Sequence, residues 1–283
     1  MNGILLIDKE KNYTSRDIVN IVSKELNIKK VGHTGTLDPL ATGVLVVTVG
    51  EATKISELLV STYKEYIAEI TLGIKTNTYD ITGNVLEKKE VKLNKDDLIN
   101  TLNKYKKTYM QEVPIYSAVK VNGKKLYEYA RENKQVDLPK KEVTIKELEL
   151  LSFNNNTFTI RCLVSKGTYI RSLINDICNS LNIIGTMSNL KRTKQGKYSI
   201  NNCCKIEDIK NNNFKLISLK EALNDYLQIE VDDYLKNKIS NGSILENRYN
   251  EDIIVFIYHD NVLAIYKTYD KDNTKIKPWK VFK

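Results

Sequence analysis

The sequence predicts a mixed α/β (α+β) domain followed by a small β-rich domain. Apolar residues alternate along 66–73 and 158–164, as they do in β-strands. The run at 43–50 is β-branched, almost wholly apolar and bounded by glycine, which is typical of a strand buried on both faces. At 94–106 the apolar residues repeat at helical spacing behind Asn94, a good N-cap. Strands and amphipathic helices together indicate the mixed class.

The other elements follow from the same two periodicities and from turn residues. A polar, asparagine-rich stretch at 201–215 is expected to separate the main domain from the rest. In chain order, the further expected elements are a strand at 3–8, a helix capped by Thr14 or Ser15 with Ile18, Val19, Val22 and Leu26 on its apolar face, a short amphipathic helix at 51–60, a polar loop at 76–84, a hairpin around Asn122-Gly123 followed by a short helix, a helix with Ile170, Leu173, Ile174, Ile177 and Leu181 on its apolar face, and strands at 253–258 and 262–266.

Composition points to a globular, basic protein. The chain has 283 residues, of which 41% are hydrophobic and 28% charged, and its net charge is +9. Residues 228–283 contain nine Lys or Arg and nine Asp or Glu, so the whole excess lies in 1–227. A basic main domain suits a polyanionic partner such as nucleic acid, although a lysine-rich surface also serves solubility. No apolar run reaches the roughly 18–20 residues of a membrane helix, and the apolar run at the N-terminus is too brief for a signal peptide, so a cytoplasmic protein is expected.

Nothing in the sequence indicates a metal or a cofactor. The four cysteines, at 162, 178, 203 and 204, and the two histidines, at 33 and 259, lack metal-ligand spacing. Neither a Walker-type phosphate loop nor a dinucleotide fingerprint occurs. Any catalysis must therefore come from ordinary side chains.

The loop at 31–45 concentrates turn formers around one carboxylate. Three glycines within twelve positions allow positive φ or close backbone approach, and Pro39 restricts both itself and Asp38. A stiff loop that holds Asp38 in a defined place is expected. Asp38 could act as a nucleophile toward a sugar or ring carbon, or the Asp-Pro pair could simply form a turn. His33 could equally be an exposed turn residue.

Lysines and tyrosines are interleaved between 111 and 131, around the predicted hairpin. Such a surface can contact RNA phosphates with lysine and stack bases on tyrosine, although tyrosines also fill half-buried sheets. The chain has six arginines and 38 lysines. Arg171, at the start of a predicted helix, therefore hints that the forked geometry of arginine matters there.

The glycine-rich loop and several other segments resemble one enzyme family. Residues Gly32-His33-Thr34-Gly35-Thr36-Leu37-Asp38-Pro39-Leu40-Ala41-Thr42-Gly43-Val44-Leu45 closely resemble the active-site motif of the TruB family of tRNA pseudouridine synthases. Further similar blocks occur in family order over about 3–192, and they include Gly50-Glu51-Ala52-Thr53-Lys54, Lys64-Glu65-Tyr66, Ser117-Ala118-Val119-Lys120 and Lys166-Gly167-Thr168-Tyr169-Ile170-Arg171-Ser172-Leu173.

The resemblance implies roles for individual residues in a uridine pocket. Asp38 matches the catalytic aspartate, and Arg171 matches the arginine that pairs with it. Tyr66 matches the tyrosine that stacks on the target base and is a candidate general base. Tyr169 and Leu190 match residues that line the pocket.

The remaining implied residues contact RNA. His33 matches the histidine that takes the place of the extruded base, and Lys120, Lys124 and Lys166 are expected to bind RNA. The implied substrate is the T-loop uridine at position 55 of tRNA, in the T-arm stem-loop. The resemblance also implies no cofactor and no metal, no membrane, no obligatory protein partner, a monomer and a cytoplasmic location.

The implied fold is the pseudouridine synthase fold, in which helices flank a central mixed, largely antiparallel sheet. Residues 1–225 would form the catalytic domain, which includes an RNA-binding region at 64–140, and 226–283 would form a small PUA-like domain. The sequence departs from the family at Lys9-Glu10-Lys11-Asn12-Tyr13-Thr14-Ser15, where the usual proline and glycine are missing. Asn12 can still adopt the left-handed conformation that the turn requires.

Two other functions fit the same residues. One is an RNA-folding chaperone whose output is binding rather than isomerisation, and the other is a guide-RNA-dependent synthase related to dyskerin. Whether Asp38 attacks C6 of the base or C1′ of the ribose stays open at this point.

Overall fold

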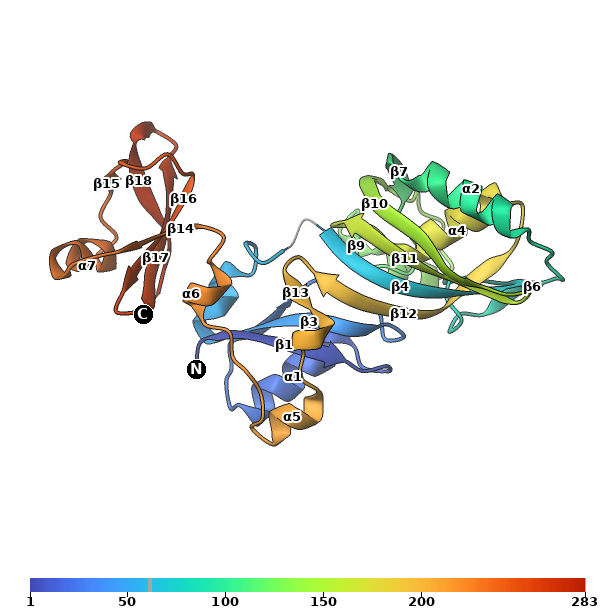
Figure 1. Ribbon diagram of the computed structural model, residues 1–283, viewed down its shortest axis with the longest axis horizontal. Coiled ribbons are helices and arrows are strands. Elements are labelled where there is room, and N and C mark those ends of the chain that lie inside the picture. The colour runs from blue at the N-terminus through green and yellow to red at the C-terminus, as the bar shows by residue number, and fades with distance from the viewer. Residues whose placement is uncertain (61–62, 283) are drawn as a thin grey trace.

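A mixed sheet lies at the centre of the molecule (Figure 1). The structure, a computed structural model, describes residues 1–60 and 63–282. Among the described strands of this sheet, β12 and β3 pair in parallel and the other pairs are antiparallel. In spatial order its strands are β1 (Gly3–Lys9), β3 (Thr42–Val49), β12 (Gly185–Gln195), β4 (Tyr63–Leu72), β11 (Thr157–Ser165), β10 (Lys140–Phe153) and β7 (Thr108–Glu112), with β2 (Val31–Thr34) on β3 and β13 (Tyr198–Ser199) on β12. The expected mixed, largely antiparallel sheet is therefore confirmed.

Helices cover the sheet through the apolar faces that the sequence predicts. The helices α2 (Lys95–Tyr105) and α4 (Ile170–Ser180) share one hydrophobic cluster with β4, β11 and β12. The helix α1 (Ser15–Glu25) packs over β1 and β3 in a separate cluster. Thr14 caps α1 in a capping box with Asp17, and Asn94 caps α2, as expected.

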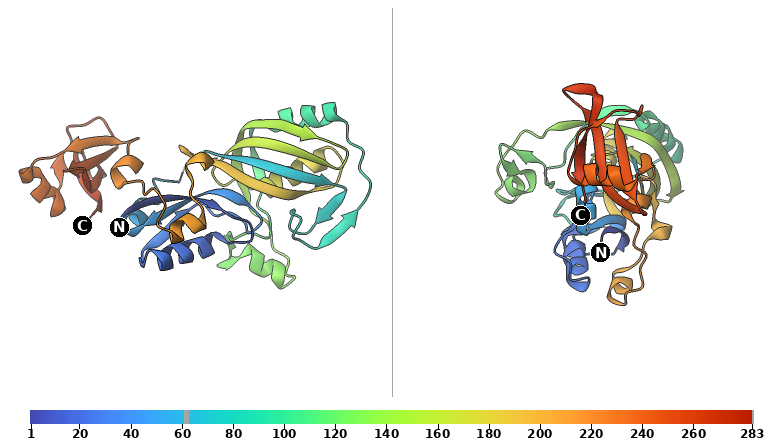
Figure 2. Two further views of the ribbon diagram at one scale, coloured as in Figure 1. Left: turned by 60° about the horizontal axis from the view of Figure 1, so that its bottom comes forward. Right: turned by 90° about the vertical axis from the view of Figure 1, so that its left-hand side faces the viewer.

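Short turns behave as their asparagines and glycines predict. Asn12 has a φ of 71°, so the turn that lacks proline and glycine is formed by left-handed asparagine. Asn122 and Gly123 both have positive φ and join β8 (Lys120–Val121) to β9 (Lys124–Lys125). The helix α3 (Leu126–Arg131) follows, and this hairpin arm projects from the body of the protein (Figure 2).

Some elements differ from expectation. The predicted amphipathic helix at 51–60 is a 3₁₀ helix, η1 (Gly50–Ile55), followed by turns, and both parts bury apolar residues, Ala52 and Ile55 in the helix and Leu59 after it. His33 belongs to strand β2 rather than to a loop. The strands β7, β10 and β12 were not predicted. Two further short strands, a 3₁₀ helix and two small α-helices are described in the main body, namely β5 (Ile74–Thr76), β6 (Val85–Lys88), η2 (Ile200–Asn202), α5 (Ile206–Lys210) and α6 (Leu219–Ala222).

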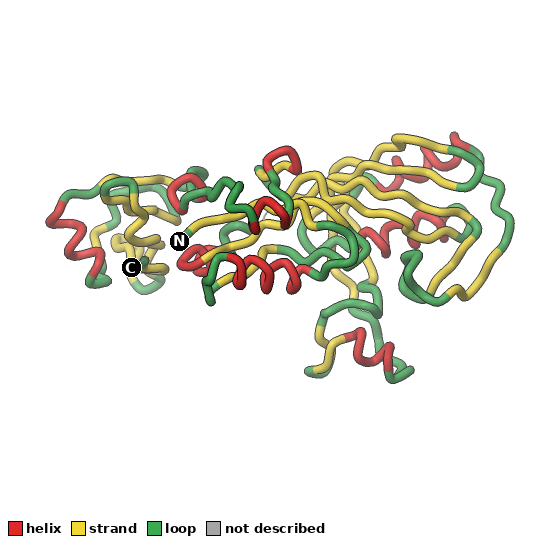
Figure 3. Tube along the Cα trace, turned by 90° about the horizontal axis from the view of Figure 1, so that it is seen from below, coloured by secondary structure: helices red, strands yellow, loops and turns green. Residues whose placement is uncertain are grey.

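The C-terminal residues form a five-stranded sheet at one end of an elongated molecule (Figure 3). The strands of this sheet are β14 (Leu227–Glu230), β15 (Leu245–Glu246), β16 (Ile253–Tyr258), β17 (Asn261–Tyr269) and β18 (Asp272–Val281), and the helix α7 (Asp233–Ser240) lies between β14 and β15 in the chain. The two expected strands at 253–258 and 262–266 are confirmed. Apolar residues of β16 and β17 share a cluster with those of β1, β3 and η1, so the two parts of the chain pack directly. Residues 204 and 217 pair with β1, so this segment runs along the main body.

Candidate active site

Asp38 and Arg171 meet across 133 positions of sequence to form an ion pair. Asp38 lies in the loop between β2 and β3, and Arg171 lies in the first turn of α4. Their Oδ2 and Nε atoms are 2.9 Å apart. The Arg171 side chain is 6% exposed, whereas that of Asp38 is 37% exposed. The pair therefore presents a carboxylate to solvent while its cation stays buried.

Main-chain carbonyls fix the guanidinium of Arg171. Its Nη1 donates to the carbonyl of Thr78 over 3.2 Å, and its Nη2 donates to the carbonyl of Tyr116 over 3.1 Å. The buried Asp80 carboxylate lies 3.9 Å from Nε. Asp80 is itself held by three hydrogen bonds from the side chains of Thr78 and Thr82 and the Thr82 amide. With its donors oriented in this way, Arg171 has a defined position beside Asp38.

Arg192 of β12 donates hydrogen bonds to the main chain on both sides of the loop that carries Asp38. Arg192 is fully buried, and its Nε and Nη2 donate to the carbonyls of Val44 and Gly35 over 2.8 and 3.0 Å. Gly43 has a φ of +101°, and a Cβ there would lie 2.2 Å from the Arg192 carbonyl oxygen. The glycine therefore permits the close approach of two backbones.

Two residues near the N-terminus hold the other side of the same loop. The hydroxyl of Ser15 accepts from the amide of Leu37 over 2.9 Å. The ammonium of Lys9, on a buried residue, donates to the carbonyls of Tyr13 and Pro39 over 2.6 and 3.4 Å. Burial lowers the pKa of Lys9 to about 8. The loop is thus held by hydrogen bonds with Lys9, Ser15 and Arg192 in addition to its own glycines and proline.

A cavity of about 560 Å³ opens in front of Asp38. Its lining includes all five residues for which a pocket role is implied, namely Asp38, Tyr66, Tyr169, Arg171 and Leu190. Tyr66 of β4 stands opposite Arg192 in the sheet, and Leu190 stands opposite Ala68. Burial raises the pKa of Tyr66 and that of Tyr169, so both phenols are neutral near pH 7. The cavity thus combines aromatic rings with one carboxylate.

Lys64 adds an amine to this cavity. It lies two residues before Tyr66 on β4 and therefore on the same face of the strand. Burial, assisted by the nearby charges of Arg192 and Lys166, lowers the pKa of Lys64 to about 8. Sequence reasoning missed the roles of Lys64, Lys9 and Arg192. The alternation along β4 could have revealed Lys64, whereas Arg192 lies in a strand that the sequence did not indicate.

The other four predicted residues lie outside the cavity lining. His33, on β2, is partly buried, and burial with the charges of Arg16 and Arg192 lowers its pKa. Lys120 and Lys124 lie on the hairpin arm, where Lys124 pairs with Glu132. Lys166 is exposed in the turn between β11 and α4.

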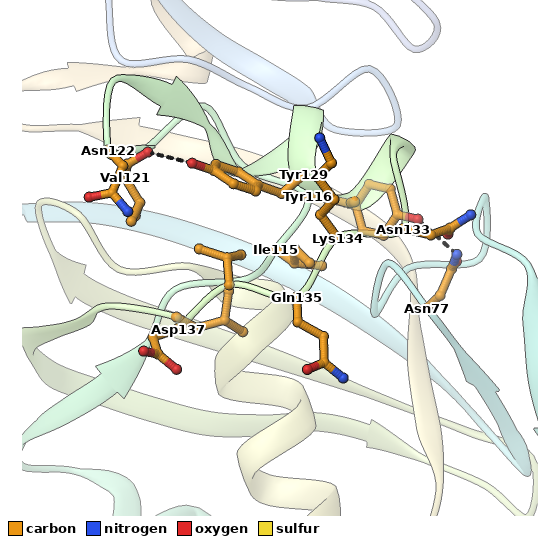
Figure 4. A pocket seen from close by; sticks show the side chains of 13 residues that line it. Asn77, Ile115, Tyr116, Val121, Asn122, Tyr129, Asn133, Lys134, Gln135 and Asp137 are labelled. Carbon is orange, nitrogen blue, oxygen red and sulfur yellow. Dashed lines mark hydrogen bonds between the residues drawn. The ribbon is translucent and has the colours of Figure 1, made fainter.

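A second cavity, of about 1070 Å³, shares Tyr116 with the first (Figure 4). The hairpin arm and the segment 133–138 line most of it. The phenol of Tyr116 accepts a hydrogen bond from Asn77 over 3.0 Å, and the phenol of Tyr129 donates to the carbonyl of Val121 over 3.1 Å. Tyr116 therefore contacts Arg171 through its carbonyl and this second cavity through its ring.

No group of three or more potential metal ligands occurs among residues 1–60 and 63–282. In the same ranges, no helix is long and apolar enough to span a membrane.

Comparison with known proteins identifies the family. Residues 23–170 match the model of the TruB family pseudouridylate synthase, N-terminal domain. A tRNA pseudouridine synthase B of Bacillus cytotoxicus is 41% identical over 298 residues, which cover 99% of this chain and 97% of the relative. One of Oceanobacillus iheyensis is 43% identical over 297 residues, covering 100% and 98%.

Solved structures share the fold at lower identity. A protein in the structure of an H/ACA RNP bound to a substrate RNA containing 2′-deoxyuridine has a TM-score of 0.72 at 21% identity, over 99% of this chain and 85% of that chain. One in a Cbf5-Nop10-Gar1 complex has a TM-score of 0.71 at 22% identity, over 99% and 84%. The family model and the relatives together show that the chain belongs to the TruB family of pseudouridylate synthases.

Proposed function

We propose that this protein converts the T-loop uridine at position 55 of tRNA to pseudouridine, with Asp38 as the nucleophile. The observation that carries the proposal is the exposed Asp38 carboxylate, which Arg171 orients over 2.9 Å at a cavity lined by tyrosines. The name that these relatives carry, tRNA pseudouridine synthase B, supports tRNA as the substrate. The cavity volume of about 560 Å³ falls in the range that small-molecule pockets occupy.

The reaction is an isomerisation, so its atoms balance without a second substrate. The bond between C1′ and N1 breaks, the ring turns, and C5 bonds to C1′. C5 then loses its proton to solvent and N1 gains one. Asp38 would form a covalent bond with C6 or C1′ during this sequence, and the adjacent guanidinium of Arg171 would favour the ionised carboxylate that the attack requires.

Tyr66 would stack on the flipped base. Burial raises the pKa of Tyr66, so its phenol is neutral near pH 7, which supports stacking. To act as a general base, Tyr66 would have to lose its proton after the substrate binds. Tyr169 and Leu190 would complete the pocket. Base extraction costs a few kcal/mol, which stacking and phosphate contacts would offset.

The RNA would lie across the basic main domain. Lys120 and Lys124 on the hairpin arm and Lys166 beside the cavity would contact phosphates, and His33 would occupy the space that the extruded base leaves. The proposal includes a catalytic domain at 1–225, a PUA-like domain at 226–283, and an enzyme that acts as a cytoplasmic monomer without an obligatory protein partner.

Tritium release from [5-³H]uridine-labelled T-arm stem-loop tests this proposal. The wild type should release tritium in the absence of any guide RNA, and Asp38→Asn should abolish release while it keeps RNA affinity within about threefold. Asp260→Asn, which changes a surface aspartate paired with Lys220, is the matched control and should stay active.

The outcomes separate the three functions. Folded wild-type protein that binds the stem-loop but releases no tritium would contradict the proposal. An Asp38→Asn variant that still restores every cellular phenotype would favour the chaperone function. Activity that appears only with an added guide RNA would favour the dyskerin-like function.

A further inference from the structure

The start of helix α4 carries both Tyr169 and Arg171, yet no side chain of its own caps it. Tyr169 occupies the N-cap position in extended geometry and makes no side-chain cap bond. Its carbonyl already accepts the first helical hydrogen bond, from the Leu173 amide over 3.0 Å, but its own amide needs a partner from elsewhere. The side chain of Gln111, near the end of strand β7, supplies that partner and adds a second donor to the carbonyl.

Gln111 binds Tyr169 in both directions. The Tyr169 amide donates to Oε1 of Gln111 over 2.8 Å, and Nε2 of Gln111 donates to the Tyr169 carbonyl over 3.2 Å. Gln111 is 1% exposed, so water does not substitute for these bonds. The side-chain amide of Gln111 thus makes with Tyr169 the same pair of hydrogen bonds that the main chain of a neighbouring strand would make.

The amide of Gln111 is itself oriented. Its Nε2 also donates to the phenol of Tyr109 over 3.0 Å, and that phenol donates to the carboxylate of Asp176 on α4 over 3.0 Å. Burial raises the pKa of Asp176. The amide therefore has a fixed orientation before any substrate arrives.

Two further contacts join residues 112–116 to Arg171 and Ser172 in the first turn of α4. The hydroxyl of Ser172 donates to the main-chain carbonyl of Glu112 over 2.9 Å, and the guanidinium of Arg171 donates to that of Tyr116. Residues 111–116 therefore hold residues 169–172 at successive points. The position of the Arg171 side chain beside Asp38 follows from this alignment.

We propose that Gln111 is a positioning residue of the active site. Its amide fixes where α4 begins, so that Arg171 meets Asp38 and Tyr169 lines the cavity. The inference rests on the proposed function, because it concerns the same ion pair. Displacing catalytic groups by about 1 Å can cost about a hundredfold in rate.

The variant Gln111→Met keeps the shape of the side chain and removes its three hydrogen bonds. Single-turnover tritium release should fall about 10- to 100-fold, whereas the dissociation constant for the stem-loop should change less than about threefold, because the lysines of the hairpin arm are untouched. Tyr105→Phe is the matched control. It removes bonds to the carbonyl of Asp176 and to Ser180, farther along α4, and should keep the wild-type rate.

A double-mutant cycle tests whether Gln111 acts through Arg171. In an Arg171→Lys background, adding Gln111→Met should lower the rate less than about twofold, because the group that Gln111 positions is already lost. The proposal would be overturned if Gln111→Met lowered the rate by the same factor in the Arg171→Lys background as in the wild type. It would also be overturned if Gln111→Met kept the wild-type rate or lost only RNA affinity.

Tyr109→Phe decides the matter if Gln111→Met does not fold. It removes the phenol that accepts from Nε2 of Gln111 and should give a smaller fall in rate at unchanged affinity, whereas an unchanged rate would overturn the proposal. Wild-type protein is assayed alongside. If it is inactive, the proposed function fails, and if it is active while these variants equal it, the role of Gln111 alone fails.

Discussion

Replacing Arg192 with methionine tests whether this buried arginine is what holds the Asp38 loop. Arg192 has three carbonyl acceptors, those of Val44, Gly35 and, at 3.5 Å, Thr36. Methionine fills much of the same volume but donates no hydrogen bond. The carbonyls of Val44 and Gly35 would then lose a charged donor inside the protein.

The magnitude follows from the two shorter bonds. Each hydrogen bond from a charged donor contributes about 1.5–3 kcal/mol, so their loss costs about 3–6 kcal/mol. Removing a buried charge returns part of this, because its desolvation is no longer required. We expect the free energy of unfolding to fall by about 2–4 kcal/mol, and the melting temperature to fall by roughly 4–16 °C for a chain of this size.

Arg161→Met is the matched control, and urea unfolding is the assay. Arg161 contacts three carboxylates, of Glu65, Glu147 and Glu149, at 2.7–2.8 Å, and its side chain is 26% exposed. Exposed ion pairs contribute little, so its loss should cost about 1 kcal/mol. Judged by the number of salt bridges alone, Arg161 would be expected to stabilise the protein more than Arg192, which has none in the described residues. If Arg161→Met destabilised the protein as much as Arg192→Met, the reasoning from burial would be refuted.

Three further predictions concern stability. Burial lowers the pKa of Lys64 to about 8 in the folded state, from its ordinary 10.5 in the unfolded chain. Between these pH values the unfolded state binds the extra proton. The free energy of unfolding of the wild type should therefore rise, relative to that of Lys64→Met, as pH rises from 8 to 10.5. Gly43→Ala places a methyl group against Arg192 at positive φ and should lower the free energy of unfolding by about 2–5 kcal/mol. Thr14→Ala removes the cap of α1 and should cost about 1 kcal/mol.

Urea unfolding at several pH values checks all three. A wild type that loses stability relative to Lys64→Met as pH rises would contradict the first. Gly123→Ala is the control for Gly43→Ala, because Gly123 also has positive φ (+80°) but nothing lies within 4 Å of its added Cβ. Equal losses in the two alanine variants would show that the contact with Arg192 is unimportant. An unchanged stability in Thr14→Ala would contradict the capping argument.

Local signals in the sequence were sufficient where neighbours in the chain decide the structure. The cap of α1 depends on Thr14 and Asp17, which are three residues apart, and the hairpin depends on the adjacent Asn122 and Gly123. The alternation along β4 and the helical spacing of α4 report burial by period alone. Such features can be read without knowing what lies across the sheet.

Strand β12 shows where this reading fails. Its buried residues include Arg192 and Gln195, which a sequence pattern assigns to solvent. They are buried because the carbonyl groups of Thr34, Gly35 and Val44, at the ends of β2 and β3 and between them, accept their hydrogen bonds. No period along the chain encodes a partner some 150 positions away. The helix α7 was missed for a different reason, since its Asp232 cap precedes only a short apolar face.

The candidate active site divides along the same line. By itself, the sequence determined that Asp38 lies in a glycine-rich loop restricted by Pro39, and the family resemblance implied roles for Arg171, Tyr66, Tyr169 and Leu190. Only the tertiary structure decided how these residues are held, through the buried amide and guanidinium donors of β7 and β12. A glycine or a proline restricts its own dihedral angles, so its effect is visible in the sequence. A buried donor acts through the acceptors that folding brings to it, so its effect exists only in the folded protein.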